Sequence, residues 1–366
     1  MNKPITVLFG TRPEAIKLAP IILKLREEKI DHQVIHTGQH LDLAEPILDI
    51  FDIEPDHRLA LMTDAQQPLD LLSRLLSELP AFIDLEKSGV LLIQGDTTTA
   101  LAGALTAHHQ KVRVAHLEAG LRSHDKMQPF PEESNRTLIS HLADLHFAPT
   151  AGARQNLLDE HISPESIHIT GNSVVDALHL ILEKSSITPE QIRSNYGIED
   201  GKLVLLTTHR RENFGKPLKD ILDAIQVIAN DHPNYTILFP SHPNPNVQKA
   251  IASLKEITNV KIIAPLQYDE FVPLMAAADL ILTDSGGIQE EAPALGTPVF
   301  VLRNKTERPE LLESGAGKLI GTDKERIIQE VNKHFQKNHS KDTLEVFGDG
   351  HSAERVVALL IAEVIQ

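Results

Sequence analysis

Short apolar runs alternate with helix-like stretches along the whole chain. Nearly continuous runs of Val, Ile and Leu are typical of strands buried on both faces of a parallel sheet. In the first half, the predicted strands are Ile5–Phe9, His32–Thr37, Val90–Gln94, Val112–Leu117, Leu145–Ala148 and Ile167–Thr170. In the second half, they are Leu203–Thr207, Thr236–Pro240, Val260–Ala264, Leu280–Thr283 and Pro298–Leu302. Between them lie amphipathic stretches such as Ala15–Glu28, Leu69–Leu85, Leu218–Ala229 and Glu325–Phe335.

This alternation predicts an α/β protein with parallel sheets and helices on both sheet faces. Ten or more strands are too many for one comfortable doubly wound sheet, so we predict two Rossmann-like domains, residues 1–171 and residues 172–351. The last helix, Ala353–Val364, has no strand after it, and we expect residues 352–366 to pack back on the first domain. Two such sheets would place the carboxyl ends of their strands, and any ligand, at a cleft between the domains.

Composition narrows the possible partners. The 366 residues include 51 acidic and 35 basic side chains, a formal net charge of −16, which disfavours nucleic acid and anionic membranes as partners. The absence of cysteine excludes disulfides, thiolate chemistry and cysteine-type zinc sites. The N-terminal apolar run is too short for a signal peptide, and no stretch approaches the ~20 apolar residues of a membrane span, so we expect a cytoplasmic protein. An anionic ligand would need a local basic pocket.

The most informative segment runs from Thr283 to Pro293. A buried strand stops at Asp284, the chain passes through Ser285, Gly286 and Gly287, and a helix-like stretch bearing Glu291 follows. A helix N-terminus in a small-residue turn suits a phosphate or diphosphate, and a carboxylate one turn later could bind a ribose diol. An ordinary strand-to-helix turn capped by Ser285 accounts for this segment equally well.

The first strand leads into a turn with two cations. Arg12 lies at the predicted strand end, Pro13 marks a helix start, and Lys17 lies one helical turn further on. Two cations there favour an anionic ligand, although surface charges flanking a helix start would look the same. The glycines of the dinucleotide-binding fingerprint are missing here and elsewhere, so no nicotinamide or flavin cofactor is predicted.

Three carboxylates follow predicted strands or open a predicted helix of the first domain. Asp96 comes two residues after the strand Val90–Gln94, and Glu118 directly follows the strand Val112–Leu117. Glu132 opens a helix with Arg136 at a spacing that allows an ion pair. Taken singly, each has a structural explanation, such as Asp96 capping the next helix. Together they predict a carboxylate cluster at one sheet edge. Carboxylates that share a site have their pKa values pushed apart, which provides a proton acceptor and a proton donor.

The second domain offers further cations at predicted strand ends. His209, followed by two arginines, ends one strand, His242 follows the next, and Arg308 comes after a later strand. Neither an Asp-x-Asp pair nor a His-Glu-x-x-His motif occurs in the sequence. We therefore predict that a bound nucleotide is neutralised by Arg, Lys, His and helix dipoles and not by a metal.

Seven blocks in the same order resemble the non-hydrolysing UDP-N-acetylglucosamine 2-epimerases of bacteria. The blocks are Phe9–Lys17, Gln94–Thr97, His116–Arg122, Pro131–Arg136, His209–Asn213, Asp284–Pro293 and Thr306–Glu310. The resemblance spans nearly the whole chain. It implies two glycosyltransferase-B-like domains, interconversion of UDP-GlcNAc and UDP-ManNAc without a cofactor, supply of ManNAc for surface polysaccharides, and a homodimer.

The resemblance also implies a mechanism and a set of site residues. UDP is eliminated to leave a 2-acetamidoglucal, and it then re-adds while a proton reaches the other face of C2. The implied catalytic residues are Asp96, Glu118, Glu132 and His209. The implied substrate-binding residues are Arg12, Lys17, Arg136, His242, Leu266, Phe271, Ser285, Gly286, Gly287, Glu291 and Arg308. Within this set, Leu266 and Phe271 would hold the uracil and Glu291 the ribose.

Two other functions fit the same motifs. A retaining glycosyltransferase of the same architecture would share the phosphate turn and Glu291, but it has no need for three carboxylates in the first domain. A UDP-sugar-binding module without catalysis is the third possibility.

Members of the family that are activated by their own substrate carry an arginine in the loop that corresponds to Met62–Pro68. Gln39-His40 is present here, but this loop has no arginine, so we expect no strong activation by UDP-GlcNAc.

Overall fold

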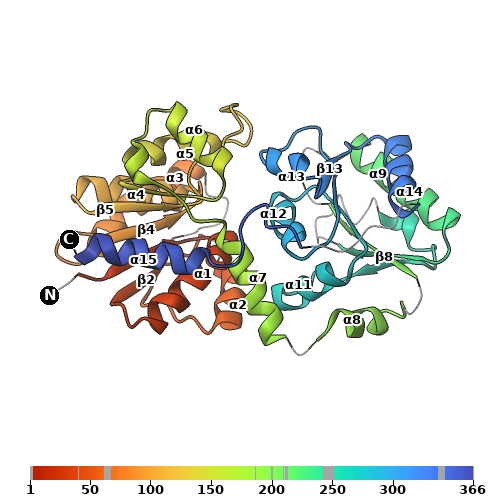
Figure 1. Ribbon diagram of the computed structural model, residues 1–366, viewed down its shortest axis with the longest axis horizontal. Coiled ribbons are helices and arrows are strands. Elements are labelled where there is room, and N and C mark those ends of the chain that lie inside the picture. Colours follow the sequence, from red (N-terminus) through yellow and green to blue (C-terminus); the bar gives the residue numbers. More distant parts are fainter. Residues whose placement is uncertain are drawn as a thin grey trace. The chain divides into compact units, whose positions relative to one another are not determined.

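The computed structural model describes residues 3–39, 41–61, 67–185, 187–198, 201–208, 210, 213–241, 251–336 and 343–365. The chain forms two compact units: unit 1 is residues 1–180 with 347–366, and unit 2 is residues 181–346 (Figure 1). The predicted division at Gly171-Asn172 lies before helix α7 (Ser173–Lys184), whereas the two units divide within that helix.

Unit 1 is built on a seven-stranded parallel sheet with the strand order β3-β2-β1-β4-β5-β6-β7. Its strands are β1 (Ile5–Phe9), β2 (His32–His36), β3 (His57–Arg58), β4 (Val90–Gln94), β5 (Arg113–Leu117), β6 (Leu145–Ala148) and β7 (Ile167–Ile169). β1 and β4 are buried along their whole length, as a central parallel strand requires. Six of the seven were predicted; the two-residue strand β3 was missed.

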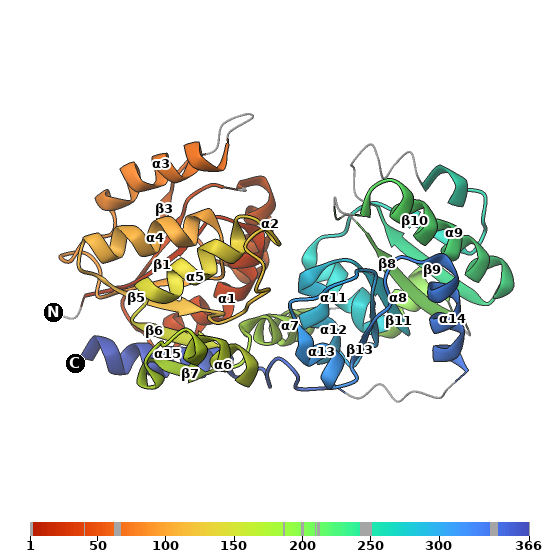
Figure 2. The same ribbon diagram turned by 90° about the horizontal axis from the view of Figure 1, so that it is seen from above.

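Helices cover both faces of this sheet (Figure 2). They are α1 (Arg12–Glu27), α2 (Leu41–Phe51), α3 (Pro68–Glu78), α4 (Thr98–His109), α5 (Glu132–Leu142), α6 (Ala151–Asp159), α7 and α15 (Ser352–Ile365), with short 3-10 turns at Leu79–Ala81 and Pro164–Ser166. α15 packs along α1. Its first turn is fixed by Asp176 of α7, which accepts hydrogen bonds from the N–H groups of Ser352 at 3.3 Å and Ala353 at 2.8 Å.

Unit 2 has a six-stranded parallel sheet with the order β10-β9-β8-β11-β12-β13. Its strands are β8 (Lys202–Thr207), β9 (Tyr235–Pro240), β10 (Val260–Ile263), β11 (Leu280–Thr283), β12 (Val299–Val301) and β13 (Gly317–Leu319). Its helices are α8 (Pro189–Asn195), α9 (Lys216–Asp231), α11 (Tyr268–Ala277), α12 (Gly286–Ala294), α13 (Pro309–Glu313) and α14 (Lys324–Phe335), with a 3-10 turn at Ile251–Leu254. The predicted fold class, two doubly wound α/β units, is confirmed.

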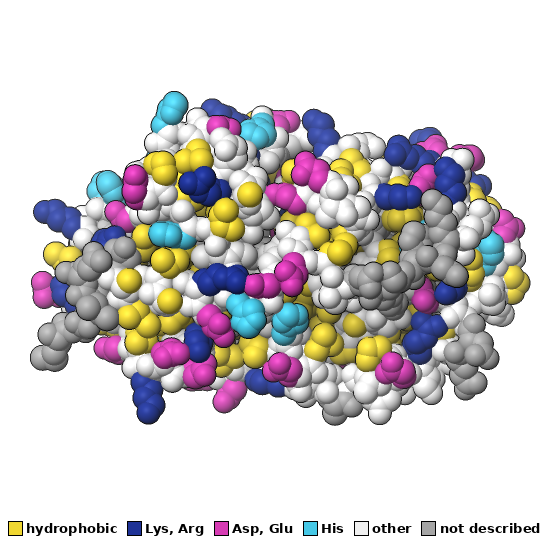
Figure 3. All heavy atoms as spheres, in the orientation of Figure 1, with side chains coloured by type: hydrophobic (Ala, Val, Ile, Leu, Met, Phe, Trp, Pro, Cys, Tyr) yellow, Lys and Arg dark blue, Asp and Glu magenta, His cyan; other side chains and the backbone are white. Residues whose placement is uncertain are grey.

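The parallel topology decides where polar side chains can gather. All strands of a parallel sheet end at the same edge, so the turns after β1, β4 and β5 lie together in unit 1, as do those after β8, β11 and β12 in unit 2. On the face drawn in Figure 3, acidic and basic side chains are interspersed, and neither charge gathers into one large patch. Among the described helices, none is long and apolar enough to cross a membrane.

Candidate active site

Glu118 follows β5 directly and is held by a lysine from α1. Lys17 Nζ forms an ion pair with Glu118 Oε2, and the two side chains are 10% and 9% exposed. Asn172 Nδ2 donates to the same oxygen at 3.4 Å. The backbone of Glu118 has a φ of 63°, a left-handed conformation that is costly for any residue with a Cβ atom. The fold therefore maintains a strained turn that presents this carboxylate beside a cation at the sheet edge.

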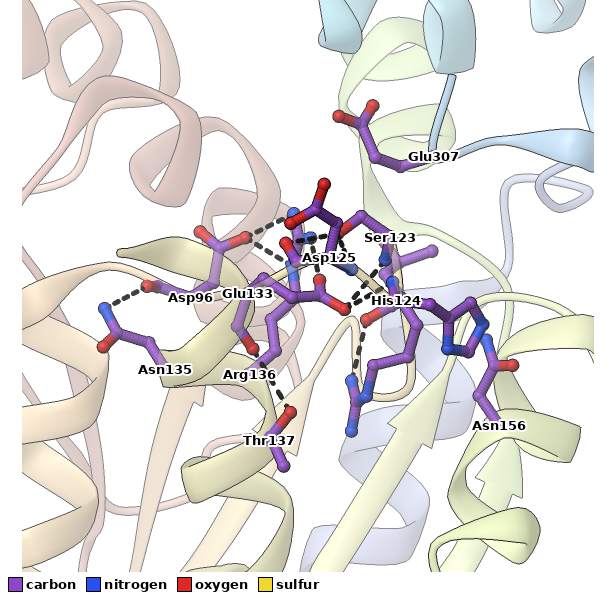
Figure 4. Close-up of polar contacts among 12 residues, drawn as sticks. Asp96, Ser123, His124, Asp125, Glu133, Asn135, Arg136, Thr137, Asn156 and Glu307 are labelled. Carbon is purple, nitrogen blue, oxygen red and sulfur yellow. Dashed lines mark hydrogen bonds and ion pairs between the residues drawn. The ribbon is translucent and has the colours of Figure 1, made fainter. Parts of the chain in front are cut away.

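Asp96 follows β4 and is bound by the start of α5. Arg136 donates from Nε and Nη2 to Asp96 Oδ2, both at 2.7 Å, and Asn135 Nδ2 donates to the Asp96 carbonyl at 2.8 Å (Figure 4). The structural explanation of Asp96 as a helix cap is wrong. Thr97 caps α4 instead, because its hydroxyl accepts from the Ala100 N–H at 3.0 Å. The Asp96 carboxylate therefore does not cap α4 and instead binds Arg136.

Glu132 is the first residue of α5. Its Oε2 atom is buried and has no hydrogen-bond partner among the described residues. The spacing along α5 would also allow an ion pair between Arg136 and Glu132. In the structure, Arg136 pairs with Glu133 instead, at 2.9 Å. Glu133 lies one helical turn from Arg136 and therefore shares its face. A buried carboxylate oxygen without a hydrogen-bond donor is costly, and such oxygens are typical of functional sites.

The first turn of α1 contains a carboxylate that sequence reasoning missed. Glu14 is completely buried, and its Oε2 accepts from the N–H groups of Gly10 at 3.1 Å and Thr11 at 2.8 Å. Its Oε1 accepts from the Thr97 hydroxyl at 2.7 Å. Burial raises the pKa of Glu14 to about 7 against these hydrogen bonds. Glu14 ties the turn that carries Arg12, half-buried at the start of α1, to the turn that carries Asp96. The Thr-x-x-Glu capping spacing could have revealed it.

In unit 2, two arginines flank the start of α12. A Cβ atom placed on Gly286 would lie 3.3 Å from Nη2 of Arg210 and 3.3 Å from Nη1 of Arg308, so both guanidinium groups lie against this turn. Arg308 is oriented by the buried Glu290, whose Oε1 accepts from Arg308 Nε at 2.6 Å. The space beside Gly287 is open, with nothing within 4 Å of where its Cβ atom would be. Arg210, the first of the two arginines that follow His209, therefore joins Arg308 at the N-terminus of α12.

Buried polar contacts continue around this turn. Glu291, one turn into α12, accepts a hydrogen bond from the Tyr268 hydroxyl at 2.9 Å. Ser285 is the N-cap residue of α12. Leu266 and Phe271, both half-buried, lie on either side of the first residues of α11. The Tyr268–Glu291 contact joins α11 to α12, so the predicted ribose residue on α12 is connected to the helix that carries Phe271 and follows Leu266.

Asp284 fixes the segment that follows β8. It is fully buried and accepts hydrogen bonds from the Thr208 hydroxyl at 2.9 Å, the Arg210 N–H at 3.0 Å and Asn213 Nδ2 at 2.9 Å. His209 lies outside the described residues. His242, His40 and residues 62–66 also lie outside them. Within the described parts of the chain, no group of three or more His, Asp or Glu side chains could hold a metal ion.

Comparison with known proteins assigns the family. A family model described as UDP-N-acetylglucosamine 2-epimerase matches residues 23–361. The chain belongs to the UDP-N-acetylglucosamine 2-epimerase family. It is 42% identical to the UDP-N-acetylglucosamine 2-epimerase of Campylobacter jejuni over 99% of this chain and 98% of that protein. It is also 42% identical to the enzyme of that name from Escherichia coli K12, over 97% of this chain and 98% of that protein.

Solved structures of UDP-GlcNAc 2-epimerases support the same family assignment. The Neisseria meningitidis UDP-GlcNAc 2-epimerase bound to UDP-GlcNAc has a TM-score of 0.90 and 40% identity, covering 98% of this chain and 100% of that chain. The Methanocaldococcus jannaschii enzyme in complex with UDP-GlcNAc and UDP has a TM-score of 0.83 and 38% identity, covering 98% of this chain and 99% of that one. The family and the class of enzyme, an epimerase, are those predicted from the sequence.

Proposed function

We propose that this protein interconverts UDP-GlcNAc and UDP-ManNAc by eliminating UDP and adding it back. The observation that carries the proposal is the set of three carboxylates in unit 1. Asp96 is held by Arg136 and Glu118 by Lys17, whereas Glu132 has a buried oxygen with no described partner. A binding module or a glycosyltransferase does not need such a set, and family membership supports the same reaction.

The chemistry explains why several carboxylates are needed. The C2 proton of the sugar is not acidic, because no carbonyl adjoins it. When the C1–O bond to UDP breaks, its electron pair leaves with the diphosphate and positive charge builds at C1. A base then removes the C2 proton, and the C2–H electrons form the C1=C2 double bond of 2-acetamidoglucal. Re-addition delivers a proton to the other face of C2, while a diphosphate oxygen bonds to C1.

Unit 1 supplies the proton-transfer groups in this proposal. Asp96, Glu118 and Glu132 together serve as proton acceptor and proton donor for the two faces of C2. Lys17 pairs with Glu118 in a buried site, where an ion pair is screened less than at the surface. Arg12, at the first turn of α1, and His209 act on the departing diphosphate.

Unit 2 binds the nucleotide. The diphosphate receives hydrogen bonds from the N–H groups of Gly286 and Gly287 at the start of α12, in the turn that begins at Ser285, and charge from Arg308 and Arg210. Glu291 binds the ribose diol, and the uracil lies against Leu266 and Phe271. His242 adds a further polar contact. Cationic side chains and a helix dipole thus neutralise the diphosphate without a metal ion.

The wider role follows from the family resemblance. The proposed enzyme works in the cytoplasm as a homodimer and supplies ManNAc units for surface polysaccharide. The dimer is tested by sedimentation velocity at micromolar concentration, where a single monomeric species would contradict it.

Product analysis tests the reaction itself. The purified protein is incubated with UDP-GlcNAc or with UDP-ManNAc, and both reactions are followed by proton NMR to equilibrium. The proposal predicts the same final ratio of the two UDP-sugars from either side, with no added cofactor. Bulk release of free ManNAc would indicate a hydrolysing enzyme, and unchanged substrate with intact binding would indicate a binding module. Conversion that needs a sugar acceptor would indicate a glycosyltransferase.

A further inference from the structure

Glu133, which neither the sequence motifs nor the proposed mechanism assigns a role, uses its two carboxylate oxygens for different purposes. Oε1 accepts from the backbone N–H groups of Ser123 and His124, both at 2.9 Å. Oε2 accepts from Arg136 Nη1, also at 2.9 Å. The side chain is only 4% exposed. One oxygen therefore holds the loop between β5 and α5, and the other holds an arginine.

The same arginine holds Asp96. Arg136 gives Nη1 to Glu133 and both Nε and Nη2 to Asp96 Oδ2, so its planar group bridges the two carboxylates (Figure 4). A guanidinium that meets carboxylates on two of its edges is fixed in orientation as well as position. Asn135 fixes the main chain of Asp96 in addition. The first two turns of α5 thus determine where the Asp96 carboxylate lies.

The charge of Glu133 suits this arrangement. Burial on its own would raise the pKa of Glu133. The N–H groups of Ser123 and His124 and the Arg136 guanidinium outweigh burial and bring this pKa below its usual value. Glu133 is therefore a carboxylate at neutral pH, and Arg136 lies between two acidic groups.

We propose that Glu133 is a positioning residue that acts through Arg136 to set the Asp96 carboxylate for proton transfer at C2. This inference rests on the proposed function, and it assigns Arg136 to Asp96 where the sequence resemblance assigned it to the substrate. Because α5 also begins with Glu132, one helix end places two of the three proposed proton-transfer groups. The loop held by Oε1 includes His124, whose φ of 59° is left-handed, so the same carboxylate stabilises an unfavourable backbone turn.

The two roles can be separated by one substitution. In Glu133→Gln, the amide oxygen can still accept from Ser123 and His124, so the loop stays in place. The amide NH2 group then faces the guanidinium of Arg136. Because both groups are hydrogen-bond donors, Arg136 loses the hydrogen bond and ion pair that hold it in place. We expect kcat to fall about 10- to 100-fold, as for a small misplacement of a reacting group, while KM for UDP-GlcNAc changes less than about threefold. Arg136→Lys, which keeps the charge but cannot bridge both acids, should show the same split.

A double-mutant cycle distinguishes positioning from a general structural effect. If Glu133 works through Asp96, adding Glu133→Gln to Asp96→Asn should lower the residual rate no further. Glu160→Gln is the matched control. This substitution breaks the 2.7 Å ion pair between Glu160 and Arg122. Arg122 lies on the loop that Glu133 holds, but the pair does not involve Asp96, so kcat should stay within about twofold of wild type.

The outcomes separate this inference from the proposed function. A wild-type protein that forms no UDP-ManNAc overturns the proposed function, and this inference with it. With an active wild type, full kcat in both Glu133→Gln and Arg136→Lys overturns the positioning role. An equal further loss in the Asp96→Asn background also overturns it. If Glu133→Gln does not fold, Arg136→Lys and its own cycle with Asp96→Asn decide the question.

Discussion

Glu14→Gln should remove a pH dependence of stability that is built into unit 1. Glu14 is fully buried in the first turn of α1, and its pKa is raised to about 7 from 4.5. Between these values the folded state keeps a proton that the unfolded chain releases. The free energy of unfolding therefore falls as the pH rises through this window. The glutamine side chain imitates the neutral acid: its oxygen accepts from Gly10 and Thr11, and its NH2 group can donate to the Thr97 hydroxyl.

The pKa difference sets the size of the effect. At about 1.4 kcal/mol for each pKa unit, wild type should lose roughly 2–3 kcal/mol relative to Glu14→Gln between pH 5 and pH 8. Other titrating groups, including His116, whose pKa burial lowers to about 3, are common to both proteins and cancel in the difference. The variant should be the less stable protein, or equal, at pH 5 and the more stable one at pH 8.

Urea unfolding followed by far-UV circular dichroism measures both proteins across this range. The chain has no tryptophan, and its tyrosines, Tyr196, Tyr235 and Tyr268, all belong to unit 2, so intrinsic fluorescence would not report on Glu14. Hydrogen exchange of peptides from β1 and α1 assigns the change to unit 1. The exposed Glu86→Gln is the control and should run parallel to wild type. If Glu14→Gln also runs parallel to wild type from pH 5 to pH 8, the reasoning about Glu14 is refuted.

Three further results are expected. Replacing Arg308 or Arg210 by glutamine should each weaken UDP binding by about 1–3 kcal/mol in calorimetry, because each removes a charge-assisted contact at the start of α12; unchanged affinity in both variants would contradict the pocket. Exchanging any one of the three carboxylates for its amide should lower turnover by ~10²–10⁴-fold, and near-normal rates in all of them would remove the proton-transfer assignment. Those variants are Asp96→Asn, Glu118→Gln and Glu132→Gln. EDTA should change neither UDP binding nor turnover, and a strict need for magnesium would show that a metal neutralises the diphosphate.

The fold was accessible from sequence because its strands are almost uninterrupted apolar runs. Those runs appear in the structure within a residue or two of the predicted bounds. β3, with the sequence His-Arg, and β13, with the sequence Gly-Lys-Leu, were missed because neither contains an apolar run. The division within α7 could not be read either, since a helix that crosses a boundary shows the same pattern on both sides of it.

The site was only partly accessible. Motifs made Asp96, Glu118 and Glu132 candidates, but the side chains that pair with them depend on which helices and strands pack together. Local spacing allowed a pair between Glu132 and Arg136, whereas the fold gives Arg136 to Glu133 and Asp96, because Asp96 reaches the same helix face from the neighbouring strand end. The strained φ of Glu118 likewise has no signature in the sequence, as glycine, the usual residue for such a turn, comes only at Gly120.

The most direct test of the account is deuterium incorporation at C2. The protein is incubated with UDP-GlcNAc in deuterated water, and both UDP-sugars are recovered at equilibrium and examined by NMR and mass spectrometry. If the C2 proton is removed and redelivered by groups that exchange with solvent, UDP-ManNAc and the recovered UDP-GlcNAc should each carry one carbon-bound deuterium, at C2 and at no other carbon. UDP-ManNAc formed without deuterium at C2, or unlabelled UDP-GlcNAc as the only sugar recovered, would contradict proton transfer by the carboxylates of unit 1.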